Sequence, residues 1–172
     1  MVITNAAGSK HIFLMSGDIF FARDRLVIDT VLGSCVTLVL WHPQQRLAAM
    51  CHYILPRNPQ TKVRGHDYRY ADAAFYFFMK NIADFNTQPA EYEVALFGGS
   101  AMSSLTTLAG VMSVGDANVK VAKQLLQEYD FTVISEDVGG DKARYVRFDT
   151  ATGQVSLKEN SEIITSPVKG VA

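Results

Sequence analysis

Two stretches of this chain repeat apolar residues with the period of an α-helix, at 70–85 and at 117–129. In both, apolar side chains recur at three- and four-residue steps, which predicts an amphipathic helix with one buried face. Asp116 directly precedes the second stretch, and we expect it to cap that helix. The residues expected on the buried faces are Ala71, Ala74, Phe75, Phe78 and Ile82 in the first helix, and Val121, Ala122, Leu125, Leu126 and Tyr129 in the second.

The rest of the chain is dominated by short apolar runs separated by turn residues, a pattern typical of β-strands. Many strands with two helices predict a mixed α+β domain. We expect one domain over residues 1–172, with flexible tails at 1–10 and 159–172 and exposed loops at 57–69 and 100–115. The predicted strands lie at 12–15, 19–21, 26–28, 37–41, 47–50, 92–97, 131–135, 145–148 and 155–158.

Two of these runs flank a turn centred near Gln44 and predict an antiparallel hairpin. In that register Cys35 lies opposite Tyr53, and His52 lies opposite Val36. The thiol and the imidazole are then near neighbours, as a nucleophile–base pair requires, and a neighbouring histidine lowers the pKa of a thiol. The alternative is that Cys35 is a small buried hydrophobe and His52 a hydrogen-bonded core histidine.

The residues around this pair differ in their expected roles. Gly33 and Ser34 give a small, flexible approach to Cys35 and leave backbone N–H groups free to stabilise an oxyanion. Cys51 is adjacent to His52 and therefore points to the opposite face, which favours core packing.

Composition narrows the class of protein. Hydrophobic residues make up 48% and charged residues 19% of the chain, as in a folded globular protein. The net charge of -1 provides no basic field for nucleic acid or anionic lipid. No run of about 18 apolar residues is present, and residues 1–5 do not resemble a signal peptide. We therefore expect a cytoplasmic protein with free thiols that neither binds nucleic acid nor inserts into a membrane.

Four segments, taken in order, resemble the CheD family of chemoreceptor glutamine deamidases. The resemblance covers roughly residues 15–158 and includes the interval from the cysteine to the histidine. The segments are Leu32-Gly33-Ser34-Cys35-Val36 with the 49–56 segment Ala-Met-Cys-His-Tyr-Ile-Leu-Pro, then Phe97-Gly98-Gly99-Ser100-Ala101-Met102, Val114-Gly115-Asp116-Ala117-Asn118-Val119, and 136–144 with its Gly-Gly-x-x-x-Arg pattern.

This resemblance implies both a fold and an activity. The fold is a sandwich of mixed β-sheets flanked by two or three helices. The activity is the deamidation of glutamine side chains on methyl-accepting chemotaxis receptors, with release of ammonia and with no metal or organic cofactor. The implied catalytic residues are Cys35, His52 and a threonine, for which Thr30 is the candidate. Asp29, one residue earlier, remains an alternative because a carboxylate also orients a histidine.

The resemblance also implies a second role, as a regulatory binding module for CheC, the phosphatase of phosphorylated CheY. An unrelated cysteine hydrolase such as a thioesterase is a third option. Gly98 and Gly99 are expected beside the active site, and a phosphate-binding loop is rejected because no Gly-Lys-Ser/Thr follows them. The spacings of Cys51 and the other histidines, which are His11, His42 and His66, match no metal motif.

Overall fold

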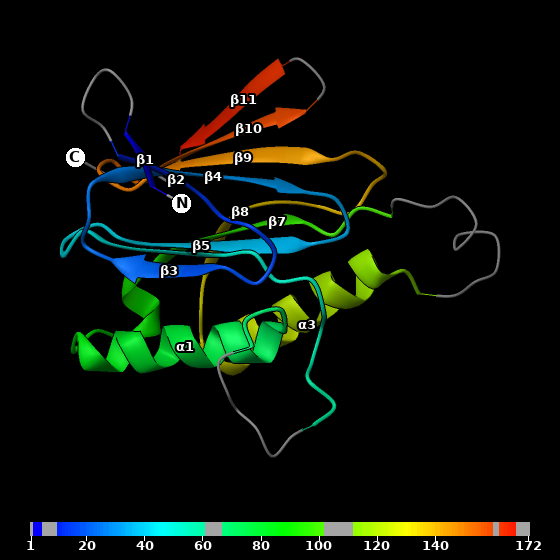
Figure 1. Ribbon diagram of the computed structural model, residues 1–172. Helices are drawn as coiled ribbons and strands as arrows, with labels where there is room; N and C mark the ends of the chain where they lie inside the picture. The colour runs from blue at the N-terminus through cyan, green and yellow to red at the C-terminus, as the bar shows by residue number, and fades with distance from the viewer. Residues whose placement is uncertain (1, 5–9, 61–66, 102–111, 160–161, 168–172) are drawn as a thin grey trace.

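The protein folds into three layers, a six-stranded sheet, a five-stranded sheet and a pair of helices (Figure 1). The structure, a computed structural model, describes residues 2–4, 10–60, 67–101, 112–159 and 162–167. The two sheets and the pair of helices confirm the expected α+β sandwich. Parts of the predicted loops, at 61–66 and 102–111, lie outside the described residues, as do His66 and Met102.

Both sheets are mixed, because β2 runs parallel to β4 and β7 runs parallel to β8, while the other pairs are antiparallel. The six-stranded sheet contains, in spatial order, β1 (Val2–Thr4), β2 (Lys10–Phe13), β4 (Leu26–Leu32), β9 (Arg144–Asp149), β10 (Gln154–Glu159) and β11 (Glu162–Pro167). The five-stranded sheet contains β3 (Ile19–Ala22), β6 (Leu47–Cys51), β5 (Val36–His42), β7 (Glu93–Gly98) and β8 (Val133–Val138).

The five-stranded sheet is the central layer and has a hydrophobic core on each face. Toward the helices, Val36, Leu38 and Leu40 of β5 pack with the buried face of α1 (Ala71–Asp84) and α3 (Val114–Glu128). Toward the other sheet, Val39 and Trp41 pack with residues of β4 and β9. All seven residues of β5 are buried, which agrees with its largely apolar sequence. A short 3-10 helix, η1 (Pro89–Glu91), precedes β7.

Both predicted helices are present, but the second begins three residues earlier than expected. Its N-cap is Ser113, whose Oγ accepts a hydrogen bond from the Asp116 backbone N–H at 3.0 Å. Asp116 is the third residue of the helix and completes a capping box with Ser113. The prediction that Asp116 caps the helix was wrong because Gly115, which suggests a loop, lies inside the first turn.

The hairpin of β5 and β6 is confirmed, but its register is shifted by one residue. Val39 pairs with Met50, and an isolated bridge joins Val36 to Tyr53. Side chains alternate along a strand, so this shift changes which residues share a face. Cys35 and His52 now both face the six-stranded sheet, whereas the predicted register would have placed them on opposite faces.

The two ends of the described chain also differ from expectation. Strand β1 lies within the predicted N-terminal tail, and β11 lies within the predicted C-terminal tail, paired with β10. The β-branched run Ile163-Ile164-Thr165 favours a strand, but the polar residues around it suggested a tail.

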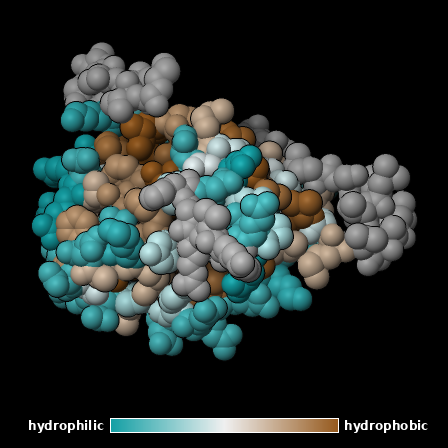
Figure 2. Space-filling model, turned by 60° about the horizontal axis from the view of Figure 1, so that its bottom comes forward, coloured by the Kyte–Doolittle hydropathy of each residue, from teal (hydrophilic) through white to brown (hydrophobic). Residues whose placement is uncertain are grey.

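The helix side of the molecule is turned toward the viewer in Figure 2, where hydrophilic side chains gather along its lower margin. On α1, the exposed side chains of Lys80 and Asp84 form an ion pair at 2.8 Å. Within the described part of the chain, no helix has the length and apolar character needed to cross a membrane.

Candidate active site

Cys35 lies where the chain passes from one sheet to the other. Strand β4 ends at Leu32 in the six-stranded sheet, and β5 begins at Val36 in the five-stranded sheet. Leu32 and Val36 are fully buried, whereas Gly33, Ser34 and Cys35 between them are partly exposed. The Cys35 residue is therefore partly exposed at the crossover rather than enclosed in the core.

The segment that follows β7 forms backbone hydrogen bonds with this crossover. The Gly99 N–H donates to the Cys35 carbonyl at 2.7 Å, and the Ser100 N–H donates to the Gly33 carbonyl at 2.9 Å. Gly98 has a φ of 110°, and a Cβ there would clash with the Cys35 carbonyl oxygen. Gly98 and Gly99 thus lie beside Cys35, and the Gly99 N–H is occupied by the protein itself.

His52 follows β6 and is oriented by Thr30, which belongs to the opposite sheet. Thr30 Oγ1 lies 2.8 Å from His52 Nδ1 and donates its own proton to the Leu14 carbonyl, also at 2.8 Å. Because that hydroxyl proton is used, Thr30 accepts from an Nδ1–H of His52. The proton on Nδ1 leaves Nε2 as the basic nitrogen of the ring.

Asp29, the other candidate for this role, faces away from His52. Its carboxylate accepts two hydrogen bonds from Arg147, at 2.7 and 3.1 Å. Adjacent residues of a strand point to opposite faces, so Thr30 points into the sandwich and Asp29 points outward.

The turn that joins β2 to β3 packs on His52 and was not predicted to be part of the site. The Gly17 N–H donates to the His52 carbonyl at 2.7 Å, and the His52 N–H donates to the Asp18 carbonyl at 3.0 Å. Ser16 Oγ lies 3.5 Å from His52 Nε2. The sequence Ser16-Gly17-Asp18 indicates a turn, but nothing in it indicates which distant residue the turn contacts.

The surroundings shift the pKa values of the Cys35 thiol and the His52 imidazole. Burial raises the pKa of the Cys35 thiol, and hydrogen bonds from the Ser16 side chain and from the Cys35 backbone oppose that change. Burial lowers the pKa of His52, and the Leu14 carbonyl and the Asp18 charge oppose that change. Both directions favour a neutral Cys35 thiol and a neutral His52 imidazole at neutral pH. The expected lowering of the Cys35 pKa was wrong: burial raises it, and the contributions that oppose burial come from Ser16 and the Cys35 backbone rather than from His52.

Cys51 is fully buried on the face that packs against the helices. Its burial raises the pKa of its thiol to about 12, so this thiol is neither accessible nor ionised near neutral pH. The expected core-packing role of Cys51 is confirmed.

Asn118 of α3 connects the two segments that bear Cys35 and His52. Its fully buried side-chain amide donates to the carbonyls of Ser34 and Ile54, each at 3.0 Å. The Tyr53 hydroxyl donates to the Asn118 backbone carbonyl at 2.9 Å. This clamp was missed because an asparagine five residues into a helix is usually a surface residue.

A buried arginine anchors the glycine segment behind Cys35. Arg144 Nη1 donates to Ser100 Oγ at 2.7 Å, and its Nη2 contacts Asp137 at 2.8 Å. The Gly98–Ser100 segment is thereby tied to the start of β9, which pairs with β4 beside the crossover.

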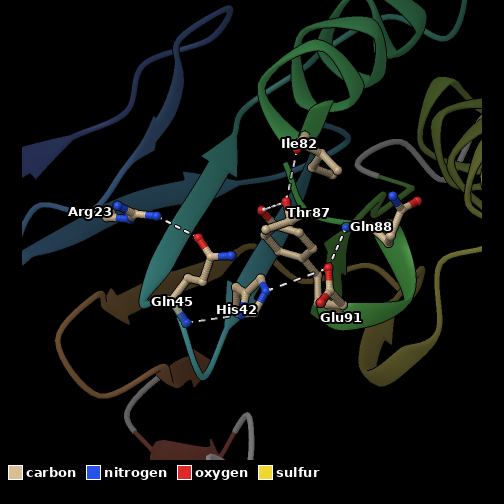
Figure 3. Close-up of polar contacts among 8 residues, drawn as sticks. Arg23, His42, Gln45, Ile82, Thr87, Gln88 and Glu91 are labelled. Carbon is tan, nitrogen blue, oxygen red and sulfur yellow. Dashed lines mark hydrogen bonds and ion pairs between the residues drawn. The ribbon is translucent and has the colours of Figure 1, made fainter. Parts of the chain in front are cut away.

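His42 lies at the other end of β5, about 20 Å from Cys35 at the usual rise of a strand. Figure 3 shows that it closes the hairpin turn, where the Gln45 backbone N–H donates to His42 Nδ1 at 3.3 Å. His42 Nε2 lies 3.9 Å from a carboxylate oxygen of Glu91. Among the described residues, no three His, Cys, Asp or Glu side chains gather in a group that could hold a metal ion.

Comparison with known proteins gives consistent matches. Residues 54–159 match the family model described as CheD chemotactic sensory transduction. The chain is 38% identical over 148 residues to a probable chemoreceptor glutamine deamidase CheD 3 of Dechloromonas aromatica, covering 86% of each protein. It is 37% identical to CheD 2 of Geobacter sulfurreducens, covering 86% of this chain and 89% of the relative, and 32% identical to CheD of Pseudomonas syringae pv. tomato, covering 92% and 94%. Both are also named as probable chemoreceptor glutamine deamidases.

Proposed function

This chain belongs to the CheD family, and we propose that it deamidates glutamine side chains of chemoreceptors, with Cys35 as nucleophile and His52 as general base. The relatives named above support the reaction and the substrate. The contact between Thr30 of one sheet and His52, which follows a strand of the other, supports the assignment of residues.

The reaction begins with a neutral pair. His52 Nε2 takes the thiol proton as the Cys35 sulfur attacks the side-chain amide carbon of the glutamine. The Nδ1–H of His52 remains bonded to Thr30, which stabilises the imidazolium in the orientation needed for the next step. The carbonyl oxygen of the amide becomes an oxyanion in the tetrahedral intermediate.

Backbone N–H groups of the crossover are the oxyanion donors that we assign. The Cys35 N–H belongs to the same residue as the attacking sulfur and so lies close to the attacked carbon. The Ser34 N–H precedes it in the same partly exposed segment. Donors fixed in this way stabilise the developing charge without reorganising during the reaction.

The second half of the reaction releases both products. The imidazolium of His52 protonates the amide nitrogen, the carbon–nitrogen bond breaks, and ammonia leaves a thioester on Cys35. His52 then takes a proton from water, which attacks the thioester carbon. Departure of the sulfur restores the thiol and leaves glutamate on the receptor. Every proton in this sequence is held by Cys35, His52, water or substrate.

The proposal is tested by incubating the protein with a purified chemoreceptor cytoplasmic fragment and measuring ammonia release and receptor mass. Each deamidated glutamine adds about 1 Da. We expect activity in the wild type and its loss, by at least about a hundredfold, in Cys35→Ala and in His52→Ala. Cys51→Ala is the matched control, because it removes the other thiol outside the proposed machinery.

Activity that persists in Cys35→Ala would contradict the assignment of the nucleophile. A folded wild type that is inactive on the receptor would contradict deamidation and favour the regulatory role through CheC. Thermal unfolding of each variant shows whether a loss of activity reflects a loss of folding.

A further inference from the structure

The carbonyl groups of Gly33 and Ser34 in the crossover are both held by groups inside the protein. The Gly33 carbonyl accepts from the Ser100 N–H at 2.9 Å. The Ser34 carbonyl accepts from the side-chain amide of Asn118 at 3.0 Å. Ser100 and Asn118 are fully buried, so both carbonyl groups are directed toward the interior.

These two bonds also fix the direction of the N–H groups assigned as oxyanion donors. No peptide bond in the described ranges is cis, and in a trans peptide unit the C=O and the N–H point in opposite directions. The Gly33 carbonyl shares its peptide unit with the Ser34 N–H, and the Ser34 carbonyl shares its unit with the Cys35 N–H. Both N–H groups are therefore directed away from the buried Ser100 and Asn118, as oxyanion donors must be.

Ser100 is held in turn by Arg144, the first residue of β9. Arg144 Nη1 donates to Ser100 Oγ at 2.7 Å, and Ser100 Oγ donates to the Lys142 carbonyl at 2.5 Å. Arg144 pairs with Leu32, the last residue of β4, and both are buried. The guanidinium therefore enters the core at the residue pair that immediately precedes the crossover.

The hydrogen bonds of this guanidinium are incomplete. Nη2 donates to Asp137 at 2.8 Å and Nη1 also donates to the Lys142 carbonyl at 3.3 Å, but Nε is buried without a hydrogen-bond partner in the described part of the chain. A buried cation with an unpaired donor is costly, and an apolar side chain would fill the same space without that cost. The planar fork of arginine reaches Ser100 and Asp137 in fixed directions at once, whereas a lysine ammonium is a single point charge. These features favour a role for Arg144 beyond stability.

We propose that Arg144 is a positioning residue that directs the Ser34 N–H toward the oxyanion. Its bond to Ser100 Oγ fixes the Ser100 backbone, and the Ser100 N–H then fixes the Gly33 carbonyl. Because the peptide unit is rigid, the Ser34 N–H is fixed with it. Arg144 acts through Ser100 and makes or breaks no bond of the substrate. This inference rests on the proposed function for its role in turnover, but the donor geometry is measurable without a receptor.

The test compares two reagents that react with the same thiol. Iodoacetamide alkylates Cys35 by displacing iodide from a saturated carbon, and no oxyanion forms. 4-Nitrophenyl acetate acetylates Cys35 through a tetrahedral oxyanion and releases 4-nitrophenolate. In both reactions the thiol proton is lost to a base. The ratio of the acetylation rate to the alkylation rate therefore reports the oxyanion donors, whereas a change in thiol accessibility or ionisation alters both rates. Cys51→Ala is the background, so that one thiol remains.

Two variants break the bond between the guanidinium and the hydroxyl from opposite sides. Arg144→Lys keeps the positive charge but loses the fork, and Ser100→Ala removes the hydroxyl but keeps the backbone N–H. Arg147→Lys is the matched control, because Arg147 lies two residues further along β9 and its half-exposed side chain bonds to Asp29. Thermal unfolding shows whether each variant is folded.

We expect the ratio of acetylation to alkylation to fall by roughly fivefold to fiftyfold in Arg144→Lys and in Ser100→Ala, because outright loss of one oxyanion donor costs on the order of a hundredfold. The alkylation rate stays within about twofold of the background. Arg147→Lys keeps the ratio of the background. The double variant of Arg144 and Ser100 loses no more than the stronger single variant, because both changes break one bond. In receptor deamidation, kcat of Arg144→Lys falls by a similar factor while KM is nearly unchanged.

An unchanged ratio in both variants would overturn the positioning role, and deamidation by the wild type would then leave the proposed function intact. Equal falls of acetylation and alkylation would show a general structural effect and would also overturn it, as would a failure of both variants to fold. A lowered ratio in the variants of a protein whose wild type fails to deamidate the receptor would support the donor geometry and contradict the proposed function instead.

Discussion

At the scale of single residues, the site depends on which nitrogen of His52 is basic. Thr30 is fully buried and uses its own proton on Leu14, so it can only accept from Nδ1. That arrangement directs the lone pair of Nε2 toward the partly exposed side of the ring, where Ser16 and the crossover lie. A threonine can thus fulfil the orienting role for which a carboxylate is used in related triads.

Replacing Thr30 by valine removes this acceptor and keeps the shape of the side chain. We expect kcat of Thr30→Val to fall by about tenfold to a hundredfold with little change in KM, because the histidine loses its fixed tautomer rather than a substrate contact. Thr150→Val is the control, since Thr150 is also a buried threonine. It follows β9 and donates to the carbonyl of Leu26, at the opposite end of β4 from the crossover. A kcat for Thr30→Val equal to that of the control would show that the Thr30 hydroxyl does not orient the base.

The lowered pKa of His52 and the raised pKa of Cys35 predict a broad pH optimum for deamidation. The active form has a neutral His52 and a thiol on Cys35, so kcat/KM rises as pH increases through the pKa of His52, which burial lowers below 6.5. The value of kcat/KM falls at high pH, where the Cys35 thiol is ionised and His52 carries no proton to donate. Burial raises the pKa of Cys35, so this fall lies above the ordinary thiol value of 9.0. The measurement is a kcat/KM profile from pH 5 to pH 10. A narrow maximum between closely spaced limits at acidic pH would indicate a preformed thiolate instead.

At the scale of elements, the side chain of Asn118 connects α3 to the proposed catalytic centre. Asn118 joins the crossover before Cys35 to the segment after His52, and Tyr53 holds the helix in register with that segment. Gly115 in the first turn permits this approach, since a Cβ there would contact the Gly99 and Ser100 carbonyls. The helix therefore sets the separation of the two catalytic segments.

Truncation of Asn118 tests this clamp. In Asn118→Ala, two buried carbonyl groups lose their donor, and we expect the free energy of unfolding to fall by about 1–3 kcal/mol. We also expect kcat to fall while the protein remains folded. Asn118→Asp keeps the size but presents a carboxylate to the same carbonyls, so it should be less stable than Asn118→Ala. Urea unfolding with deamidation assays measures both effects, and an Asn118→Asp protein as stable as the wild type would contradict the clamp.

Much of the element pattern was predictable because it depends on local periodicity. Helix α1 and the hairpin of β9 and β10 lie close to their predicted positions. The family segments indicate Cys35 and His52 as the candidate pair, although the predicted register of the β5–β6 hairpin placed them on opposite faces. The register of that hairpin was not predictable, because a turn with Pro43 and two glutamines permits more than one pairing. Ser16 and Asn118 escaped prediction for a different reason: each contacts the site from a distant part of the chain.

At the scale of the whole molecule, the site is assembled from both sheets. Thr30 belongs to the six-stranded sheet, His52 follows a strand of the five-stranded sheet, and Cys35 lies on the crossover between them (Figure 1). The hydrophobic core between the sheets, which includes Ile28, Met50 and Phe148, therefore holds together the two sheets that carry these residues. The two sheets must therefore pack together before the site can form.

The central claim is that a thioester forms between Cys35 and a receptor glutamine, and the most direct measurement is mass analysis of the receptor fragment after deamidation in hydroxylamine. Hydroxylamine competes with water for a thioester and leaves a hydroxamate, about 16 Da heavier than the glutamine rather than about 1 Da. The account predicts the hydroxamate at the deamidated sites with the wild type and its absence with Cys35→Ala. Deamidation that proceeds without any hydroxamate, or a hydroxamate that still forms with Cys35→Ala, would contradict it.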